Sequence, residues 1–230
     1  MRVGGRQMCA EVFGTFALVF SGTGAIVIND DRGGAVTHVG IALTFGLIVL
    51  AMIYSIGDVS GCHLNPAVTL GFFAAGRTTW HSILPYIFSQ CSGALLASLL
   101  LRLMFPLHPT LGATIPSGSA AQSFLLELVL TMILMFVILS VSSGSNEKGA
   151  MAGIAIGSVI ALEAMFAGPI SGASMNPARS LGPAVVSLNL THLWIYLVAP
   201  TLGACVSVIA YRSVHGTKAD CGNESQESGA

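Results

Sequence analysis

The sequence predicts an all-α membrane protein with six transmembrane helices and two re-entrant half-helices, arranged as an inverted repeat. Two observations carry this prediction. Of the 230 residues, 53% are hydrophobic and only 8% are charged, whereas about 25% of an average soluble domain is charged. In addition, a stretch of twelve residues occurs twice, at 60–71 and at 171–182, with seven identical positions in register.

Six apolar segments are long enough to span a bilayer, for which a helix needs about 20 residues. The predicted spans are 7–28, 36–56, 82–104, 121–141, 150–167 and 192–211. The polar stretches between them are a turn at 29–34, a break at 77–81, a Pro-, Gly- and Ser-rich connection at 105–120 and a charged loop at 142–149. The basic start resembles the n-region of a signal peptide, but the following apolar run is too long, so we expect a retained first span.

The two half-helices are predicted from an Asn-Pro-Ala triplet in each copy of the repeated stretch. The triplets are Asn65, Pro66, Ala67 and Asn176, Pro177, Ala178. A residue before Pro is kept out of the helical region, and Pro favours the first position of a helix. Each Asn is therefore expected to cap a helix that covers 66–76 or 177–187. Eleven residues span roughly 16 Å, which is about half of the hydrocarbon core.

Three spans and one half-helix per half force the second half to enter the membrane upside down. Each half also opens with a span that carries one glutamate, Glu11 or Glu127. The half-helices should meet at the midplane with unsatisfied N–H groups, which are tolerated there only beside a polar cavity or inside protein. We therefore expect a single transmembrane channel domain over 1–230, with repeats at about 7–104 and 121–212 and a disordered, cytoplasmic polar tail at 213–230.

The orientation follows from the basic residues, which gather on the cytoplasmic side of membrane proteins. With the N-terminus inside, the cytoplasmic side receives Arg2, Arg6, Arg77, Lys148, Arg212 and Lys218. The outer side receives Arg32 and, near a membrane edge, Arg102. We predict a multi-pass protein of the cell membrane, plasma or inner, in contact with membrane lipid and with both termini in the cytoplasm.

Several other functions are disfavoured by the composition. The formal net charge of −1 and the lack of a basic stripe give no support for nucleic-acid binding. The five cysteines show neither metal-ligand spacing nor a disulfide framework. No nucleophile–base pair or phosphate loop occurs at recognisable spacing. We expect no metal, no cofactor and no enzymatic activity.

The paired Asn-Pro-Ala triplets, the six spans, the opening Ala-Glu-Val-Phe-Gly-Thr at 10–15 and the run Ser-Gly-x-x-x-Asn-Pro-Ala-Arg-Ser at 171–180 resemble the aquaporin, or major intrinsic protein, family. The resemblance covers about residues 8–212 and implies an aquaporin-like fold. The stretches 52–57 and 166–175 are especially similar to the nodulin-type branch and its bacterial relatives. The resemblance also implies a homotetramer with one pore per subunit.

By this resemblance, Asn65 and Asn176 donate side-chain N–H groups to a file of permeating molecules; the alternative is that they only cap the half-helices. Glu11 and Glu127 would accept hydrogen bonds from the re-entrant loops, with proton relay as the alternative. His63 would be a structural group whose carbonyl lines the pore, and a metal-ligand role is the competing interpretation.

The resemblance places the narrowest constriction at Phe45, Ala164, Ala173 and Arg179. Arg179 could alternatively form an ion pair that holds the loop. Water-selective members of the family usually carry His where this chain has Ala164, so the constriction should be wider and partly apolar. Glycerol channels usually carry Trp at the position of Phe45 and Asp where this chain has Ser180. The filter is thus a hybrid, and we expect passage of water and of small neutral solutes such as glycerol, urea or neutral metalloid acids.

Two other functions compete with that of a passive channel. Inverted repeats and broken helices also occur in ion- or proton-coupled secondary transporters, although no acidic cluster flanks the two Asn residues. The third hypothesis is a structural membrane protein with a closed pore.

Overall fold

The computed structural model describes residues 3–142 and 150–216. Its helices are α1 (Gly5–Asp31), α2 (Thr37–Ser60), α3 (Pro66–Ala74), α4 (Trp80–Met104), α5 (Ala120–Val141), α7 (Ala152–Ser171), α8 (Pro177–Ser187) and α9 (Leu193–His215). Six of these helices are long and apolar enough to cross a membrane, and α3 and α8 are the two short ones. The predicted all-α membrane fold is confirmed.

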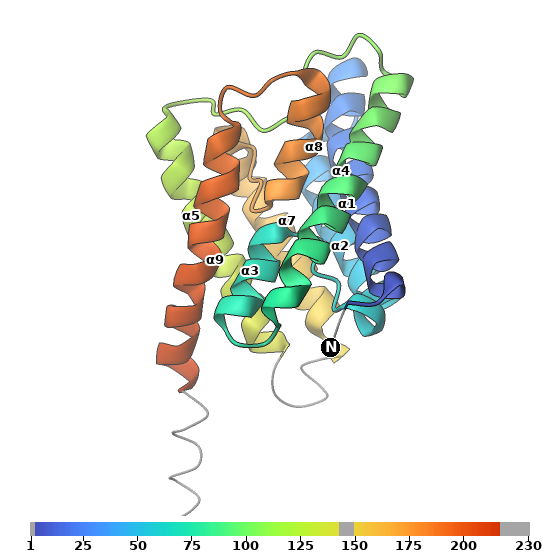
Figure 1. Cartoon of the computed structure of the whole chain (residues 1–230). Coiled ribbons are helices and arrows are strands. Elements are labelled where there is room, and N and C mark those ends of the chain that lie inside the picture. Colours follow the sequence, from blue (N-terminus) through green and yellow to red (C-terminus); the bar gives the residue numbers. More distant parts are fainter. Residues whose placement is uncertain (1–2, 143–149, 217–230) are drawn as a thin grey trace, which may run out of the picture.

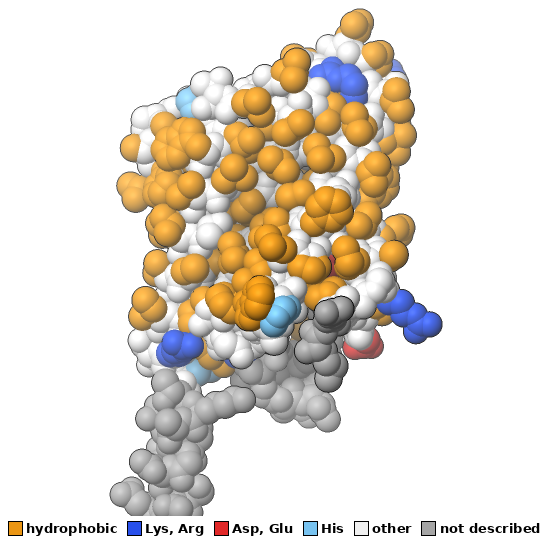
Figure 2. Space-filling model, in the orientation of Figure 1, with side chains coloured by type: hydrophobic (Ala, Val, Ile, Leu, Met, Phe, Trp, Pro, Cys, Tyr) orange, Lys and Arg blue, Asp and Glu red, His pale blue; other side chains and the backbone are white. Residues whose placement is uncertain are grey.

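The long helices form an upright bundle, with α8 toward one end and α3 toward the other (Figure 1). The start of α1 and the end of α9 lie at the same end of the bundle as α3. Figure 2 shows apolar side chains spread over the flank between the two ends, while the Lys and Arg side chains on this face lie near the ends. This distribution suits a bundle that is surrounded by lipid and faces water at both ends.

The packing of the second half repeats that of the first. Helix α1 packs against α2 and α4, and α5 packs in the same way against α7 and α9. Each short helix packs mainly against a long helix of the other half: α3 against α9, and α8 against α4. The two halves thus interlock, and each half-helix is held largely by a span of the other half.

Helices α2 and α7 cross at a pair of glycines that the repeat relates to each other. A Cβ atom on Gly46 would lie 2.4 Å from the carbonyl oxygen of Gly157, and a Cβ on Gly157 would lie 2.7 Å from the carbonyl oxygen of Gly46. No side chain fits between these backbones. Small residues that allow close helix contact are typical of membrane interfaces, and this pair holds the two halves together at their centre.

Replacing Gly46 by Ala is expected to destabilise the protein, because the new methyl group would press on the Gly157 carbonyl and force α2 and α7 apart. Overpacking of this kind costs about 1–3 kcal/mol. Gly57→Ala on the same helix is the matched control, since a Cβ there has nothing within 4 Å. It should be neutral or stabilising by up to about 1 kcal/mol. Thermal unfolding in detergent measures both, and equal melting temperatures for the two variants would contradict the close crossing.

The helix ends differ from the predicted bounds at several places. Helices α2 and α7 continue four residues past 56 and 167, and they end where Gly61 and Gly172 adopt left-handed φ angles of 80° and 86°. The half-helix α3 ends at Ala74, two residues before the predicted end. Helix α9 runs to His215, so the start of the predicted polar tail is helical. The predicted disorder of 217–230 and most of the predicted loop at 142–149 lie outside the described residues.

The extension of α7 includes Pro169, which lacks the N–H group that would bond to the carbonyl of Met165. The ring Nε2 of His38, from the start of α2, donates a hydrogen bond of 2.7 Å to this carbonyl instead. The helix therefore passes through a proline with its freed acceptor satisfied.

Candidate pore and its constriction

The two half-helices begin alike, with an Asn at the N-cap and a Pro at the first helical position. The side-chain oxygen of Asn65 accepts a hydrogen bond of 2.9 Å from the N–H of Ala67. The side-chain oxygen of Asn176 accepts from the N–H groups of Ala178 and Arg179. Capping of this kind typically stabilises a helix by about 1 kcal/mol. It also fixes each amide group at the tip of its half-helix.

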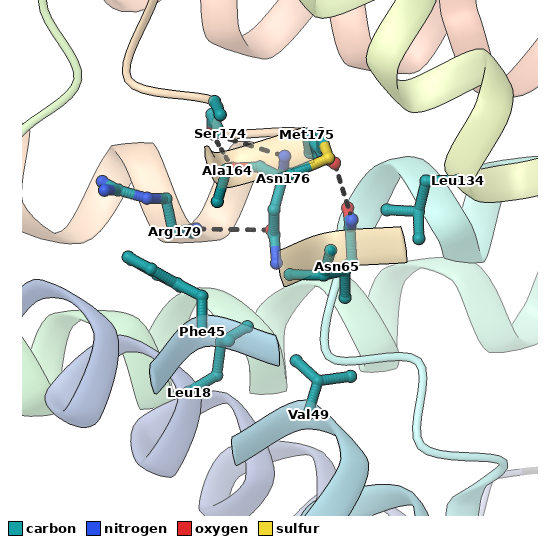
Figure 3. Close-up of a pocket in the computed structure, with 12 residues that line it drawn as sticks. Leu18, Phe45, Val49, Asn65, Leu134, Ala164, Ser174, Met175, Asn176 and Arg179 are labelled. Carbon is teal, nitrogen blue, oxygen red and sulfur yellow. Dashed lines mark hydrogen bonds between the residues drawn. The ribbon is translucent and has the colours of Figure 1, made fainter. Parts of the chain in front are cut away.

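Each Asn amide also reaches across to the loop of the other half, as Figure 3 shows for Asn65 and Met175. The Nδ2 of Asn65 donates 2.7 Å to the carbonyl of Met175, and the Nδ2 of Asn176 donates 2.8 Å to the carbonyl of Leu64. An amide NH₂ has two hydrogens, so this tie uses one and leaves one on each side chain. The reciprocal tie, which the sequence did not indicate, holds the two tips together.

The loops that precede the Asn residues have an unusual backbone. Besides the capping glycines, φ is positive at Cys62 (50°) and Leu64 (52°) in the first loop, and at Ala173 (41°) and Met175 (54°) in the second. Left-handed conformations cost roughly 1–2 kcal/mol per non-glycine residue. These loops therefore need strong external support, which a glutamate provides in each half.

Glu11 binds the first loop with both carboxylate oxygens. Its Oε1 accepts from the hydroxyl of Ser60 (2.7 Å) and the N–H of His63 (2.9 Å). Its Oε2 accepts from the N–H of Leu64 and from Nε2 of Gln90, both at 2.8 Å. Glu11 is fully buried, and all four partners are donors to a carboxylate, which are among the stronger hydrogen bonds in proteins.

Glu127 repeats the arrangement in the second half. Its Oε1 accepts from the hydroxyl of Ser171 (2.7 Å) and the N–H of Ser174 (2.8 Å), and its Oε2 accepts from the N–H of Met175 (2.8 Å). The donors correspond position by position to three of the four that bind Glu11. The fourth, Gln90, has no counterpart at Glu127 among the described residues.

Two tyrosines that the sequence interpretation missed complete the support. The hydroxyl of Tyr86 on α4 donates 2.6 Å to the carbonyl of Ser60, and the hydroxyl of Tyr196 on α9 donates 2.7 Å to the carbonyl of Ser171. Both tyrosines are buried. They lie in equivalent spans of the two halves, so an alignment of the halves beyond the twelve-residue repeat could have found them.

His63 lies inside the first loop and contacts the first half-helix. Its ring centre lies 4.7 Å from that of Phe72, on which it stacks, and 4.8 Å from that of Tyr86, to which it is tilted. Its Nδ1 lies 3.1 Å from the hydroxyl of Thr69. Thr69 in turn receives a hydrogen bond from Gln90. His63 therefore links the loop to the first half-helix. Among the described residues no group of His, Cys, Asp and Glu forms a metal site.

The four residues of the predicted constriction line one cavity, which also contains Asn65 and Asn176. Arg179 is 2% exposed, and its guanidinium carbon lies 5.0 Å from the ring centre of Phe45. Its Nη1 donates 2.8 Å to the carbonyl of Gly112, while its Nε has no hydrogen-bond partner within the described part of the chain. Ala164 and Ala173 also line this cavity, and neither carries a polar side-chain group.

The connection between α4 and α5 positions this arginine, which the sequence did not reveal. Arg102 at the end of α4 donates to the carbonyls of Pro106 and His108, and the ring of His108 accepts from the N–H of Leu111. Gly112, which accepts from Arg179, follows directly. The connection therefore folds over the constriction and fixes the direction of the guanidinium.

A second cavity lies on the other side of the two Asn residues. It is lined by Gly61–Leu64 and by apolar side chains of α2, α5 and α7. Both cavities share the same central lining residues, which are Leu18, Val49, Asn65, Leu134, Ile160 and Asn176. The two cavities thus meet at the Asn pair, with one half-helix tip entering from each side.

The electrostatic potential inside this passage is positive. Helix N-termini carry about half a positive charge each, and both half-helices point theirs at the shared centre. Arg179 adds a full charge in the first cavity. No described residue that lines either cavity is Asp or Glu.

Comparison with known proteins identifies the family to which the chain belongs. The sequence matches the family described as Major intrinsic protein over residues 3–211. The protein named Aquaporin NIP1-1 from Zea mays is 46% identical over 92% of this chain and 76% of its own length, and Aquaporin NIP1-4 from Oryza sativa subsp. japonica is 48% identical over 92% and 78%. The structure of the aquaglyceroporin from Plasmodium falciparum matches with a TM-score of 0.79 and 29% identity, covering 90% of this chain and 94% of that one. The chain belongs to the major intrinsic protein, or aquaporin, family.

Proposed function

We propose that the chain is a passive channel for water and small uncharged solutes, which excludes ions and protons. The observation that carries this proposal is the Asn pair, because Asn65 and Asn176 line both cavities and each keeps one amide hydrogen for a molecule in the lumen. Membership of the family and the aquaporin and aquaglyceroporin relatives support it.

The exclusion of cations follows from the positive field of the lumen. Two helix N-termini and Arg179 face the passage, and no carboxylate is among its described lining residues. A coupled transporter would need a site that binds its driving cation inside the lumen. Glu11 and Glu127 do not offer one, because their oxygens are occupied by donors of the loops.

The lining of the constriction favours solutes larger than water, because two of its residues are alanines. Ala164, Ala173 and the ring of Phe45 line the constriction without polar side-chain atoms, and Arg179 supplies the polar edge. A solute with hydroxyl groups on one side and an apolar face on the other matches this wall. Glycerol has that character, and urea and neutral metalloid acids are the further candidates.

The membrane placement and assembly are part of the same proposal. The channel is a single domain of two repeats, at about 7–104 and 121–212, in the cell membrane with both ends cytoplasmic. The start of α1 and the end of α9 lie at one end of the bundle, which supports a common side for the termini. The exposed apolar flank offers contact surface for lipid and for the other subunits of a homotetramer.

Replacing Ala164 by His is expected to suppress the flux of glycerol while water flux continues, because the imidazole would fill space in the cavity that Phe45 also lines. Stopped-flow light scattering on proteoliposomes measures both permeabilities. Ser158→His, at an exposed position of the same helix, is a control outside the described cavity linings. A parent protein without glycerol flux, or an Ala164→His variant that keeps it, would contradict the wide constriction.

A further inference from the structure

We propose that Gly22 on α1 is a specificity-determining residue, because its missing side chain leaves the space into which the ring of Phe45 withdraws from the lumen. This inference rests on the proposed channel function. It names a residue outside the cavity lining that sets the width of the constriction through its neighbour.

The ring of Phe45 occupies the place where a side chain at Gly22 would begin. A Cβ atom on Gly22 would lie 2.1 Å from Cε1 of Phe45, 2.4 Å from Cδ1 and 2.4 Å from Cζ. Favourable contacts between carbon atoms begin at about 3.5 Å. One edge of the ring therefore rests directly on the backbone of α1, in a position that any other residue at 22 would deny it.

The other sides of the ring leave only one direction for movement. Phe45 is 8% exposed and packs in a cluster with Leu18, Val49 and Leu64. Figure 3 shows it between Leu18 and Arg179, and the lumen borders it on the side of the guanidinium. Because protein interiors are close-packed, a ring pushed off Gly22 has open space only toward the lumen.

Restoring ordinary carbon contacts from 2.1 Å requires the ring to shift by roughly 1.4 Å, and a shift of this size would narrow the constriction. Ala164 and Ala173 line the same cavity, and their methyl groups have no alternative rotamer that could make room. Arg179 is held by Gly112 and cannot retreat freely. The constriction therefore becomes narrower, and the permeability of the larger solutes falls most.

The test compares the ratio of glycerol to water permeability in proteoliposomes of the full chain and its variants. Gly22→Ala should lower the ratio by at least about tenfold, equivalent to about 1.4 kcal/mol of added barrier for glycerol. In the background Phe45→Ala, the further change Gly22→Ala should leave the ratio unaltered, because the ring is gone. Gly24→Ala on the same helix is the matched control, since a Cβ there meets only Leu101 at 3.5 Å.

The outcomes separate this inference from the proposed function. A parent protein that passes glycerol, with an unchanged ratio in Gly22→Ala or an equal fall in Gly24→Ala, overturns the role of Gly22 and leaves the channel intact. A Gly22→Ala protein that does not fold also overturns it, because the ring would then be unable to yield into the lumen. A parent that passes only water contradicts the wide constriction, and Gly22→Ala should in that case lower water permeability itself.

Discussion

Replacing Glu11 by Leu is expected to cause a large loss of stability and to abolish water permeability. The substitution would leave four donors without their acceptor, namely the Ser60 hydroxyl, two loop N–H groups and the Gln90 amide. Each buried donor left unpaired costs about 1–3 kcal/mol. The first re-entrant loop, which already has left-handed residues, would lose the group that holds it, and its lining of the lumen would be lost with it.

The chain contains its own controls for this prediction. Glu127→Leu removes the acceptor of three donors and should cost somewhat less than Glu11→Leu. Glu163 on α7 is 1% exposed, yet neither of its carboxylate oxygens has a hydrogen-bond partner in the described part of the chain. Glu163→Leu should therefore be neutral or stabilising, because it removes a buried carboxyl group whose burial is not offset by hydrogen bonds. Thermal unfolding in detergent ranks the three variants, and equal losses would contradict the role given to the loop hydrogen bonds.

Replacing Arg179 by Val is expected to admit protons and monovalent cations. The guanidinium is the one fully charged group assigned to the constriction. Two like charges 4 Å apart repel by about 4 kcal/mol at an effective dielectric constant of 20, which corresponds to about a thousandfold in rate. A pH-sensitive dye inside proteoliposomes measures the proton flux under an imposed gradient. Glycerol permeability should rise in the same variant, because the lumen becomes wider.

Arg179→Lys is the matched control for the charge. The ammonium group keeps the positive field, so proton exclusion should persist. It lacks the planar fork that bonds to Gly112 and stacks on Phe45, so the balance between water and glycerol should change. Proton flux at the level of the parent in Arg179→Val would contradict electrostatic exclusion at this residue.

The sequence predicted those parts of the molecule that depend on local chemistry or on repetition. The six spans follow from apolar length, and the starts of α3 and α8 follow from Asn before Pro, which fixes the backbone within a few residues. The equivalence of Glu11 and Glu127 follows from the duplicated chain. The ends of α2 and α7 were harder to predict, because Gly61 and Gly172 end them rather than the first polar residue.

The remaining features depend on contacts between distant segments, which periodicity and motifs do not encode. Arg102 lies near the end of a predicted span and Gly112 in the predicted connection, yet the folded chain uses both to hold Arg179. His38 supplies the donor for the carbonyl freed by Pro169, 127 residues from its bonding partner. Gly22 reads as one of many small residues in a span, and only the position of the Phe45 ring gives it a specific role.

The central claim is that two half-helices meeting at Asn65 and Asn176 leave an open passage for neutral molecules. Stopped-flow light scattering on proteoliposomes of the full chain tests it most directly. The account predicts that osmotic water flux exceeds that of protein-free liposomes, grows in proportion to the osmotic gradient and is unaffected by an imposed proton or sodium gradient. Flux no greater than that of the bare lipid, or flux that saturates and follows either ion gradient, would contradict it.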